Sequence, residues 1–277
     1  MRTVGSLPTP WDADPYLVGE RADDELHTHA CDDEACVLVL DGHPGRSLVG
    51  IGRPEAVARL LTQSAAAFAA LAPQTLTLAR GAWELVDGEV RDQLAGPSTT
   101  TSEWDWMSTR TPLVQPDAPV VLPDGPVVLP DGAGASREVM VERFTPGPET
   151  DALVTDCLDR AHPIASTLPG DPRLTGWWGV RESEDGALVA TVGALDIYPG
   201  APAHLVSLGV DPAHRGRGLA GLVLAAAVDD GLRRTPRVGG PMVHLGLYAA
   251  NDRARRVYQR LGFSLDHQFM SVRRAPG

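Results

Sequence analysis

The sequence contains no lysine, because all 24 of its basic residues are arginines. This absence excludes Schiff-base chemistry and any mechanism with a lysine as the general base. Long apolar runs are also missing: the longest, Leu219 to Val228, has about half the length that a bilayer span requires. The first residues are polar and proline-containing, unlike a secretory signal. We therefore expect a cytoplasmic protein that has no membrane partner.

Cysteine is scarce, with three residues in the chain. An odd number in a cytoplasmic protein predicts no disulfide framework, and Cys157 is expected to be a small buried side chain in a helix. His27, His29, Cys31 and Cys36 form a ligand-rich cluster, but no second CxxC or HxxxH pair accompanies it. We therefore expect no metal.

The acidic residues outnumber the basic ones, 36 against 24, and the excess lies at one end of the chain. Residues 1–132 contain 8 arginines and 20 acidic residues, whereas residues 133–277 contain 16 of each. The acidic front half is either a solvated surface or an attraction for a cationic partner. The arginine groups at 233–237 and 253–260 lack interleaved stacking aromatics, so we expect no nucleic-acid partner.

Length and composition together predict two domains. Residues 112–134 are dominated by Pro, Gly, Asp and Val, and they contain a tandem of two short extended pieces, each closed by Pro-Asp-Gly. We interpret residues 112–136 as a connector between an N-terminal domain, residues 1–111, and a C-terminal domain, residues 137–277.

The front domain reads as α/β. Apolar runs predict strands at 35–40, 47–52, 76–78 and 83–86, and the period-two spacing of Trp104 and Trp106 predicts another. An alanine-rich helix begins at Arg53-Pro54-Glu55 and extends to about Ala70, with proline tolerated in its first turn.

The back domain reads as α+β, with a mixed, mostly antiparallel sheet flanked by helices. The predicted strands are 139–144, 176–181, 187–197, 204–210, 243–248 and 263–272, and the predicted helices are 149–161, 218–228 and 252–261.

A glycine-rich turn gives the strongest chemical signal in this domain. The sequence LGVDPAHRGRGLA, residues 208–220, predicts a strand that ends at Val210, a turn, and the N-terminus of an amphipathic helix. Unpaired N–H groups and the helix dipole make such a terminus an anion site, and Gly216 and Gly218 would let the backbone approach a phosphate. The pattern is neither a Rossmann fingerprint nor a P-loop. A plain loop with solvated arginines is the alternative.

A second stretch, LYAANDRARRVYQRLGF at residues 247–263, predicts a short helix with both ends marked. Asn251 is a natural N-cap and Gly262 a natural left-handed stop. Asn251 and Tyr258 lie seven residues apart and so project to one side, which Ala254 leaves open.

Together, these two stretches resemble the GCN5-related N-acetyltransferase (GNAT) family. Arg215-x-x-Gly218-x-Ala220 matches its Arg/Gln-x-x-Gly-x-Gly/Ala pyrophosphate motif, and the spacing of Asn251, Ala254, Tyr258, Gly262 and Phe263 matches its following helix. The resemblance covers about residues 137–272. Tandem members exist, so the front domain, which lacks the motif, would be a degenerate GNAT-like copy without a cofactor.

The resemblance implies a role for each motif residue. The backbone of Leu208, Gly209 and Val210 would bind the pantetheine arm of acyl-CoA, with strands 204–210 and 243–248 splayed apart. Asn251 would contact this arm, Tyr258 would protonate the departing thiolate, and a backbone amide near Val210 would polarise the thioester carbonyl. The backbone amides that would hold the pyrophosphate are those of Arg215, Gly216, Arg217, Gly218, Leu219 and Ala220.

The sequence departs from the family at the general base, because the strand before the turn has no carboxylate. Asp196, His204, Glu182 and a water relay are conceivable substitutes, and the base stays unassigned. We expect an acyl-CoA-dependent N-acyltransferase that uses acetyl-CoA and no metal. Its acceptor would be a primary amine, either a small molecule or a protein amino group. The alternative is a non-catalytic acyl-CoA-binding or regulatory protein on the same fold.

Overall fold

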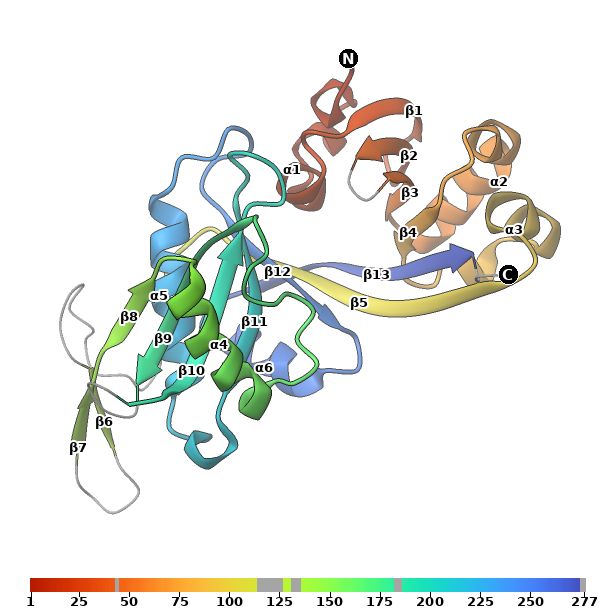
Figure 1. Cartoon of the computed structure of the whole chain (residues 1–277). Coiled ribbons are helices and arrows are strands. Elements are labelled where there is room, and N and C mark those ends of the chain that lie inside the picture. Colours follow the sequence, from red (N-terminus) through yellow and green to blue (C-terminus); the bar gives the residue numbers. More distant parts are fainter. Residues whose placement is uncertain (43–44, 114–126, 131–135, 182–185, 275–277) are drawn as a thin grey trace. The chain divides into compact units, whose positions relative to one another are not determined.

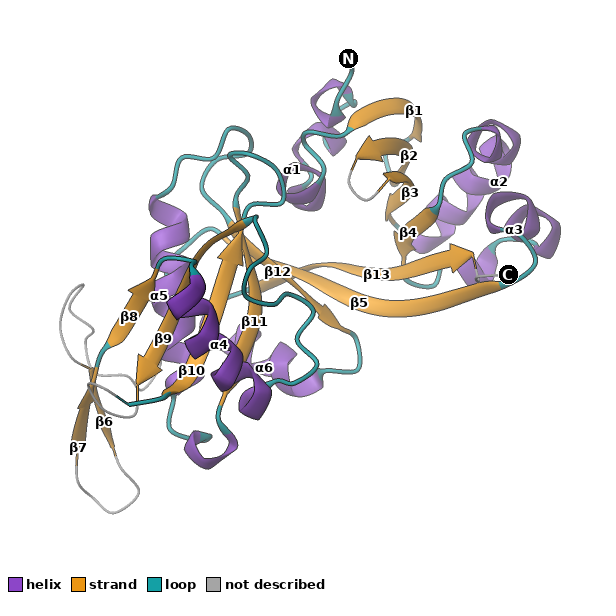
Figure 2. Ribbon diagram, viewed as in Figure 1, coloured by secondary structure: helices purple, strands orange, loops and turns teal. Residues whose placement is uncertain are grey.

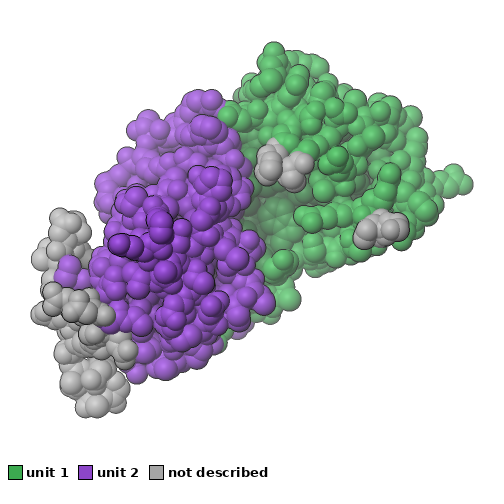
Figure 3. Space-filling view, in the orientation of Figure 1, with its two compact units in different colours: residues 1–108, 246–255, 264–277 green, residues 109–245, 256–263 purple. Residues whose placement is uncertain are grey.

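The structure is a computed structural model that describes residues 1–42, 45–113, 127–130, 136–181 and 186–274. It contains two compact units, shown in green and purple in Figure 3. Unit 1 comprises residues 1–108, 246–255 and 264–277, and unit 2 comprises residues 109–245 and 256–263. The sequence analysis divided the chain into residues 1–111 and 137–277. The two units differ from this division, because residues 246–255 and 264–277 group with the front half.

The front half of the chain forms a mixed sheet with helices packed on it (Figure 1). Its helices are α1 (Pro15–Glu20), α2 (Pro54–Ala70) and α3 (Gly88–Ala95), with 3-10 turns at Val4–Ser6, Trp11–Ala13 and Trp83–Leu85. Its strands are β1 (Glu25–Cys31), β2 (Ala35–Gly42), β3 (Gly45–Gly52), β4 (Thr75–Ala79) and β5 (Thr99–Thr109). The neighbouring pairs β1–β2 and β2–β3 are antiparallel, whereas β3 and β4 are parallel.

The last strand of the chain, β13 (Ser264–Arg274), completes the sheet of unit 1. It pairs antiparallel with β4 on one edge and with β5 on the other. Its Phe269 and Val272 are fully buried, so the C-terminal strand contributes to the core that the front half builds. A backbone strand with both edges paired cannot be removed without exposing its neighbours' hydrogen-bonding groups.

Unit 2 contains the meander and helices expected of the back domain (Figure 2). Its elements are β8 (Val141–Phe144), α4 (Pro148–Ala161), β9 (Leu174–Arg181), β10 (Leu188–Leu195), β11 (Ala203–Val210), a 3-10 turn at Pro212–His214 and α5 (Leu219–Arg233). Strand β12 (Val243–Tyr248) and helix α6 (Asp252–Leu261) carry residues of both units. Strands β8 to β11 are successively antiparallel, and β11 and β12 are parallel. The predicted mostly antiparallel sheet is confirmed.

Helices α4 and α5 cover opposite faces of these strands, with α4 in front in Figure 1. A core of buried residues between α4 and the sheet includes Leu158, Trp177 and Cys157. Cys157 is fully buried, as predicted, and burial raises the pKa of its thiol to about 11. A high pKa keeps this thiol protonated and unreactive.

The two halves share one element order. In the front half, β1–β2–β3 are followed by α2, the parallel strand β4, α3 and β5. In the back half, β9–β10–β11 are followed by α5, the parallel strand β12, α6 and β13. The front half therefore repeats the topology of the back half, as expected for a degenerate copy.

Three sequence expectations need correction, two about strands and one about the cysteines. Residues 83–86 were expected as a strand, but Trp83–Leu85 is a 3-10 turn because Gly81, at φ 89°, and Ala82 turn the chain so that Trp83 packs on the α2 core. The expected strand 139–144 is interrupted at Met140 between β7 (Ser136–Val139) and β8. The connector contains a hairpin of β6 (Val127–Pro130) with β7; its residues 114–126 and 131–135, with most of the tandem, lie outside the described residues.

The cysteine expectation was also wrong. Cys31 and Cys36 form a disulfide at the end of the β1–β2 hairpin, where they are direct cross-strand partners. Sequence spacing alone does not show that the hairpin register brings these two residues opposite each other. The described residues include no helix that combines the length and apolar character needed to cross a membrane.

A glycine in α5 determines how closely this helix approaches the sheet. A Cβ on Gly231 would lie 2.6 Å from Val243 Cγ2 and 3.0 Å from Ala203 Cβ, where β11 and β12 pair. Gly231→Ala should therefore lower the free energy of unfolding by about 1–3 kcal/mol despite its better helix propensity. Gly88→Ala in α3 is the control: no atom lies within 4 Å of the added Cβ, so this substitution should not lower the free energy of unfolding. Chemical denaturation measures both, and equal stabilities would contradict the packing argument.

Candidate active site

The candidate site begins where β11 and β12 stop pairing. Their parallel ladder contains the rungs Ala203/Val243 and His204/His244. Strand β11 continues to Val210, and its other edge stays paired to β10 through Gly209 and Val210. Among the described residues, the β11 edge from 205 to 210 therefore has no ladder partner on the β12 side, so the backbone groups that point to this side lie outside the ladder.

A β-bulge interrupts β11 within this free stretch. The register with β10 shifts between Gly193/Val206 and Thr191/Gly209, and Ser207 has a left-handed φ of 53°. Its hydroxyl donates to Thr167 O at 2.5 Å, which holds the loop after α4 against the bulge. A strained non-glycine residue costs of order 1–3 kcal/mol, and such residues gather at functional sites. Sequence analysis did not predict this bulge, which bends the backbone at Ser207, three residues before Val210.

The glycine turn forms as predicted. Gly216 and Gly218 both have positive φ, 81° and 76°, and Gly218 is the N-cap of α5 with no side-chain cap. The first hydrogen bond of the helix runs from Leu222 N to Gly218 O at 3.2 Å, so the amides of Leu219 and Ala220 precede the helical ladder. The residues around the turn are exposed, apart from the half-buried Ala220 and the buried Leu219 that anchors the helix.

The two arginines of the turn bond to protein carbonyls. Arg215 Nε donates to Val210 O at 3.1 Å, and its Nη2 donates to Ala161 O at 3.2 Å. Arg217 Nη2 donates to Ala213 O at 3.4 Å. Arg215 thus joins the end of β11 to the end of α4, a structural role that the sequence did not predict, while both guanidiniums add positive charge at the mouth of the turn.

Helix α6 has the bounds that the sequence predicted, from Asp252 to Leu261. Asn251 Oδ1 accepts from Ala254 N at 3.1 Å, which confirms the N-cap, and Gly262 ends the helix with φ 103°. Capping occupies the side-chain oxygen, whereas the amide nitrogen of this exposed residue points away from that bond.

Tyr258 is 9% exposed and its ring meets Phe263 edge-on at 5.6 Å. Burial raises the pKa of Tyr258 to about 12. Its hydroxyl makes no hydrogen bond to the described residues, and it is not among the fully enclosed polar atoms that lack a partner. A protonated, unpaired phenol at the edge of the protein interior is free to donate to a ligand.

The three side chains considered as general bases, Asp196, Glu182 and His204, have different surroundings. Both carboxylate oxygens of Asp196 accept from Arg234 Nη2, at 2.7 and 2.8 Å, so this carboxylate is held in an ion pair. Glu182 lies outside the described residues. His204 lies at the last rung of the β11–β12 ladder, with its Nδ1 3.1 Å from Nδ1 of the buried His244. The sequence could not show this pairing, which depends on the parallel register.

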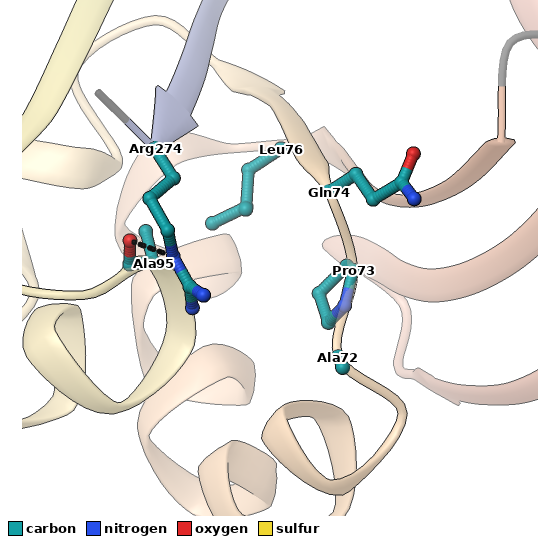
Figure 4. A pocket seen from close by; sticks show the side chains of 6 residues that line it. All are labelled: Ala72, Pro73, Gln74, Leu76, Ala95 and Arg274. Atoms are coloured by element: carbon teal, nitrogen blue, oxygen red, sulfur yellow. Dashed lines mark hydrogen bonds between the residues drawn. The ribbon is translucent and has the colours of Figure 1, made fainter. Parts of the chain in front are cut away.

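A pocket of about 200 Å³ in unit 1 is unrelated to these residues (Figure 4). It is lined by Ala72, Pro73, Gln74, Leu76, Ala95 and Arg274. The Arg274 guanidinium donates to Ala95 O at 3.2 Å there. None of the predicted site residues lines it.

Comparison with known proteins identifies the domain that these elements build. Residues 143–263 match the acetyltransferase (GNAT) family model. A match to this family supports acyl-CoA-dependent N-acyltransferase activity in general. No functionally curated protein matches the chain.

Solved structures that match this chain include GNAT proteins. A putative acetyltransferase from Novosphingobium aromaticivorans is 17% identical with a TM-score of 0.46, covering 90% of this chain and 92% of its own. A GCN5-related N-acetyltransferase from Kribbella flavida is 21% identical with a TM-score of 0.46 and 90% coverage of both chains. A tandem GNAT protein from the clavulanic acid pathway is 14% identical with a TM-score of 0.43, covering 88% of this chain and 80% of its own.

The left-handed Gly218 provides a test of the turn. Gly218→Ala should weaken coenzyme A binding about tenfold or more, because a left-handed non-glycine residue costs about 1–2 kcal/mol and would shift the amides that follow. Gly200→Ala is the matched control: Gly200 has the same φ of 76°, but it lies in the loop between β10 and β11. Calorimetric titration that gave the two variants equal affinity would remove the turn from the binding site.

Proposed function

We propose that this protein transfers an acyl group, acetyl in the first instance, from acyl-CoA to a primary amine by direct attack. One observation carries the proposal: three features follow one another along the chain. They are the free edge of β11, which starts at residue 205, the bulge at Ser207, and the glycine turn at the uncapped N-terminus of α5. A free strand edge suits the amides of a pantetheine arm, and a helix N-terminus suits a pyrophosphate.

The described residues fit such a ligand. The backbone of Leu208, Gly209 and Val210 would pair with the arm, and the N–H groups from Arg215 to Ala220 would hold the pyrophosphate. A Cβ added at Gly216 would meet no other part of the chain within 4 Å, so the turn has open space where a phosphate would approach. Asn251 would donate its free amide N–H to the arm.

Bound acyl-CoA supplies an activated carbonyl with a thiolate leaving group. A backbone N–H of the Ser207–Val210 stretch would polarise the carbonyl oxygen. The amine nitrogen forms the new C–N bond and the C–S bond breaks, with its electron pair passing to sulfur. Tyr258 donates its proton to that sulfur, and the amine proton leaves to water or to the His204 imidazole.

The alternative, a non-catalytic acyl-CoA-binding or regulatory protein, rests on the absence of a carboxylate from β11. The two functions are separated by incubating the protein with acetyl-CoA and a panel of primary amines while free thiol is measured. Calorimetric binding of coenzyme A without turnover on any amine would favour the alternative.

The role of Tyr258 predicts a specific loss. Tyr258→Phe keeps the buried ring and its contact with Phe263 but removes the proton, so kcat should fall about 10²–10⁴-fold while coenzyme A affinity changes little. Tyr198→Phe is the control, because Tyr198 is also buried and its ring stacks on Arg237 through a contact that phenylalanine preserves. Equal kcat for wild type and Tyr258→Phe would exclude the phenol as the acid.

The raised pKa of Tyr258 predicts the alkaline behaviour. A pKa of about 12 keeps the acid protonated across the assay range, so kcat should not fall between about pH 7 and 10. The measurement is a pH–rate profile with saturating acetyl-CoA. A descending limb in this range that disappears in Tyr258→Phe would mean that the folded-state pKa is far lower.

A further inference from the structure

A carboxylate outside the candidate site is buried between two arginines in unit 1. Asp105, on β5, is 0% exposed. Its Oδ1 accepts from Arg80 Nη2 at 2.6 Å, and its Oδ2 accepts from Arg255 Nε at 2.5 Å. Burying a carboxylate is costly unless its charge is paired and its oxygens are hydrogen-bonded. Each oxygen here has its own guanidinium, so the charge is fully compensated.

Arg255 extends this pairing to the segment that leads into α6. Its Nη2 donates to Ala249 O and its Nη1 to Asp252 Oδ1. Ala249 N in turn donates to Glu103 O on β5 at 3.0 Å. Residues 249–255 are therefore joined to β5 at two of its residues, Glu103 and Asp105. Hydrogen bonding to Asp105 is also the largest influence that raises the pKa of Arg255.

Asn251 lies between these two attachments. Its N–H donates to Tyr248 O at 2.9 Å, its carbonyl accepts from Arg255 N at 3.1 Å, and its side-chain oxygen caps Ala254. These three bonds determine its backbone and side-chain orientation, and two of them end on residues of the attached segment, Ala254 and Arg255. A displacement of residues 249–255 would move the Asn251 amide with them.

We propose that Asp105 is a positioning residue for acyl-CoA: through Arg255 it holds the Asn251 turn and the first turn of α6 in the orientation the ligand requires. Tyr258 follows Arg255 by three residues on the same helix, so the orientation of the first turn also sets the direction of the phenol. The front half of the chain thus supplies a residue for the function of the GNAT domain. The inference rests on the proposed function.

The alternative explanation is that Asp105 serves the stability of unit 1 and nothing else. Arg255→Gln separates the two, because Arg80 stays bonded to Asp105 and the carboxylate keeps one cationic partner. Asp252→Asn is the matched control: it removes the other carboxylate that contacts Arg255, an exposed one. Arg255→Lys restores the charge and one hydrogen bond without the planar fork.

The experiment measures kcat and KM for acetyl-CoA, normalised to the folded protein, together with coenzyme A affinity and thermal stability. Arg255→Gln should lower kcat about 10–100-fold and weaken coenzyme A binding, because small misplacements of a positioned group have effects of this size. Arg255→Lys should recover part of the loss, and Asp252→Asn should stay within about twofold of wild type. Asp105→Asn should follow Arg255→Gln.

Two results would overturn the proposal. One is an Arg255→Gln protein that melts at a lower temperature but keeps the kcat and coenzyme A affinity of wild type. The other is an equal loss in Arg255→Gln and Asp252→Asn. If Arg255→Gln does not fold, the Arg255→Lys protein supplies the same comparison. If wild type binds coenzyme A but acylates no amine, the catalytic proposal fails, and the affinity of these variants still decides whether Asp105 positions Asn251.

Discussion

The candidate site depends on one constraint, the early end of the parallel ladder between β11 and β12. Two rungs hold the strands together, and Gly231 allows α5 to lie directly on them. Beyond the second rung, the edge of β11 is free, and the bulge at Ser207 turns its backbone. The same strand leads into the glycine turn, so the free edge, the bulge and the helix N-terminus follow one another along a single chain segment.

The front half has the same topology, but its parallel strand pair and the start of its helix differ from those of the back half. Strands β3 and β4 pair over four rungs, from Ser47/Thr75 to Gly50/Leu78. Helix α2 begins at Pro54, which has no N–H to offer, and both the backbone and the side chain of Arg53 donate to Glu34. Gly52, the last residue of β3, has a positive φ of 107°, but a Cβ added there would lie 2.3 Å from Glu34 O, so this glycine is not open like Gly216. The two halves differ at this junction. In the front half, bonds from Arg53 to Glu34 hold the start of α2, whereas in the back half the N-terminus of α5 has no side-chain cap.

The front half also connects to α6 through bonds within unit 1. The buried Asp105 and the carbonyl of Glu103 hold the turn that contains Asn251, and β13 is paired between β4 and β5. A buried carboxylate with two arginine partners tolerates little displacement, because any movement leaves charge unpaired in a poorly solvated place. The bonds that the front half makes to this turn do not require the front half to bind a ligand.

Local patterns in the sequence determined much of this protein. The bounds of β12 and α6, the Asn251 cap and the left-handed stop at Gly262 followed from capping rules, turn chemistry and periodicity, which act within a few residues. Tertiary structure decided the features that join distant residues: the Cys31–Cys36 pair, the His204–His244 contact, the Ser207 bulge and the Asp105–Arg255 bond. Register and strand order set these, and a single sequence does not encode them locally, because moving a strand by one residue reverses which side chains face each other.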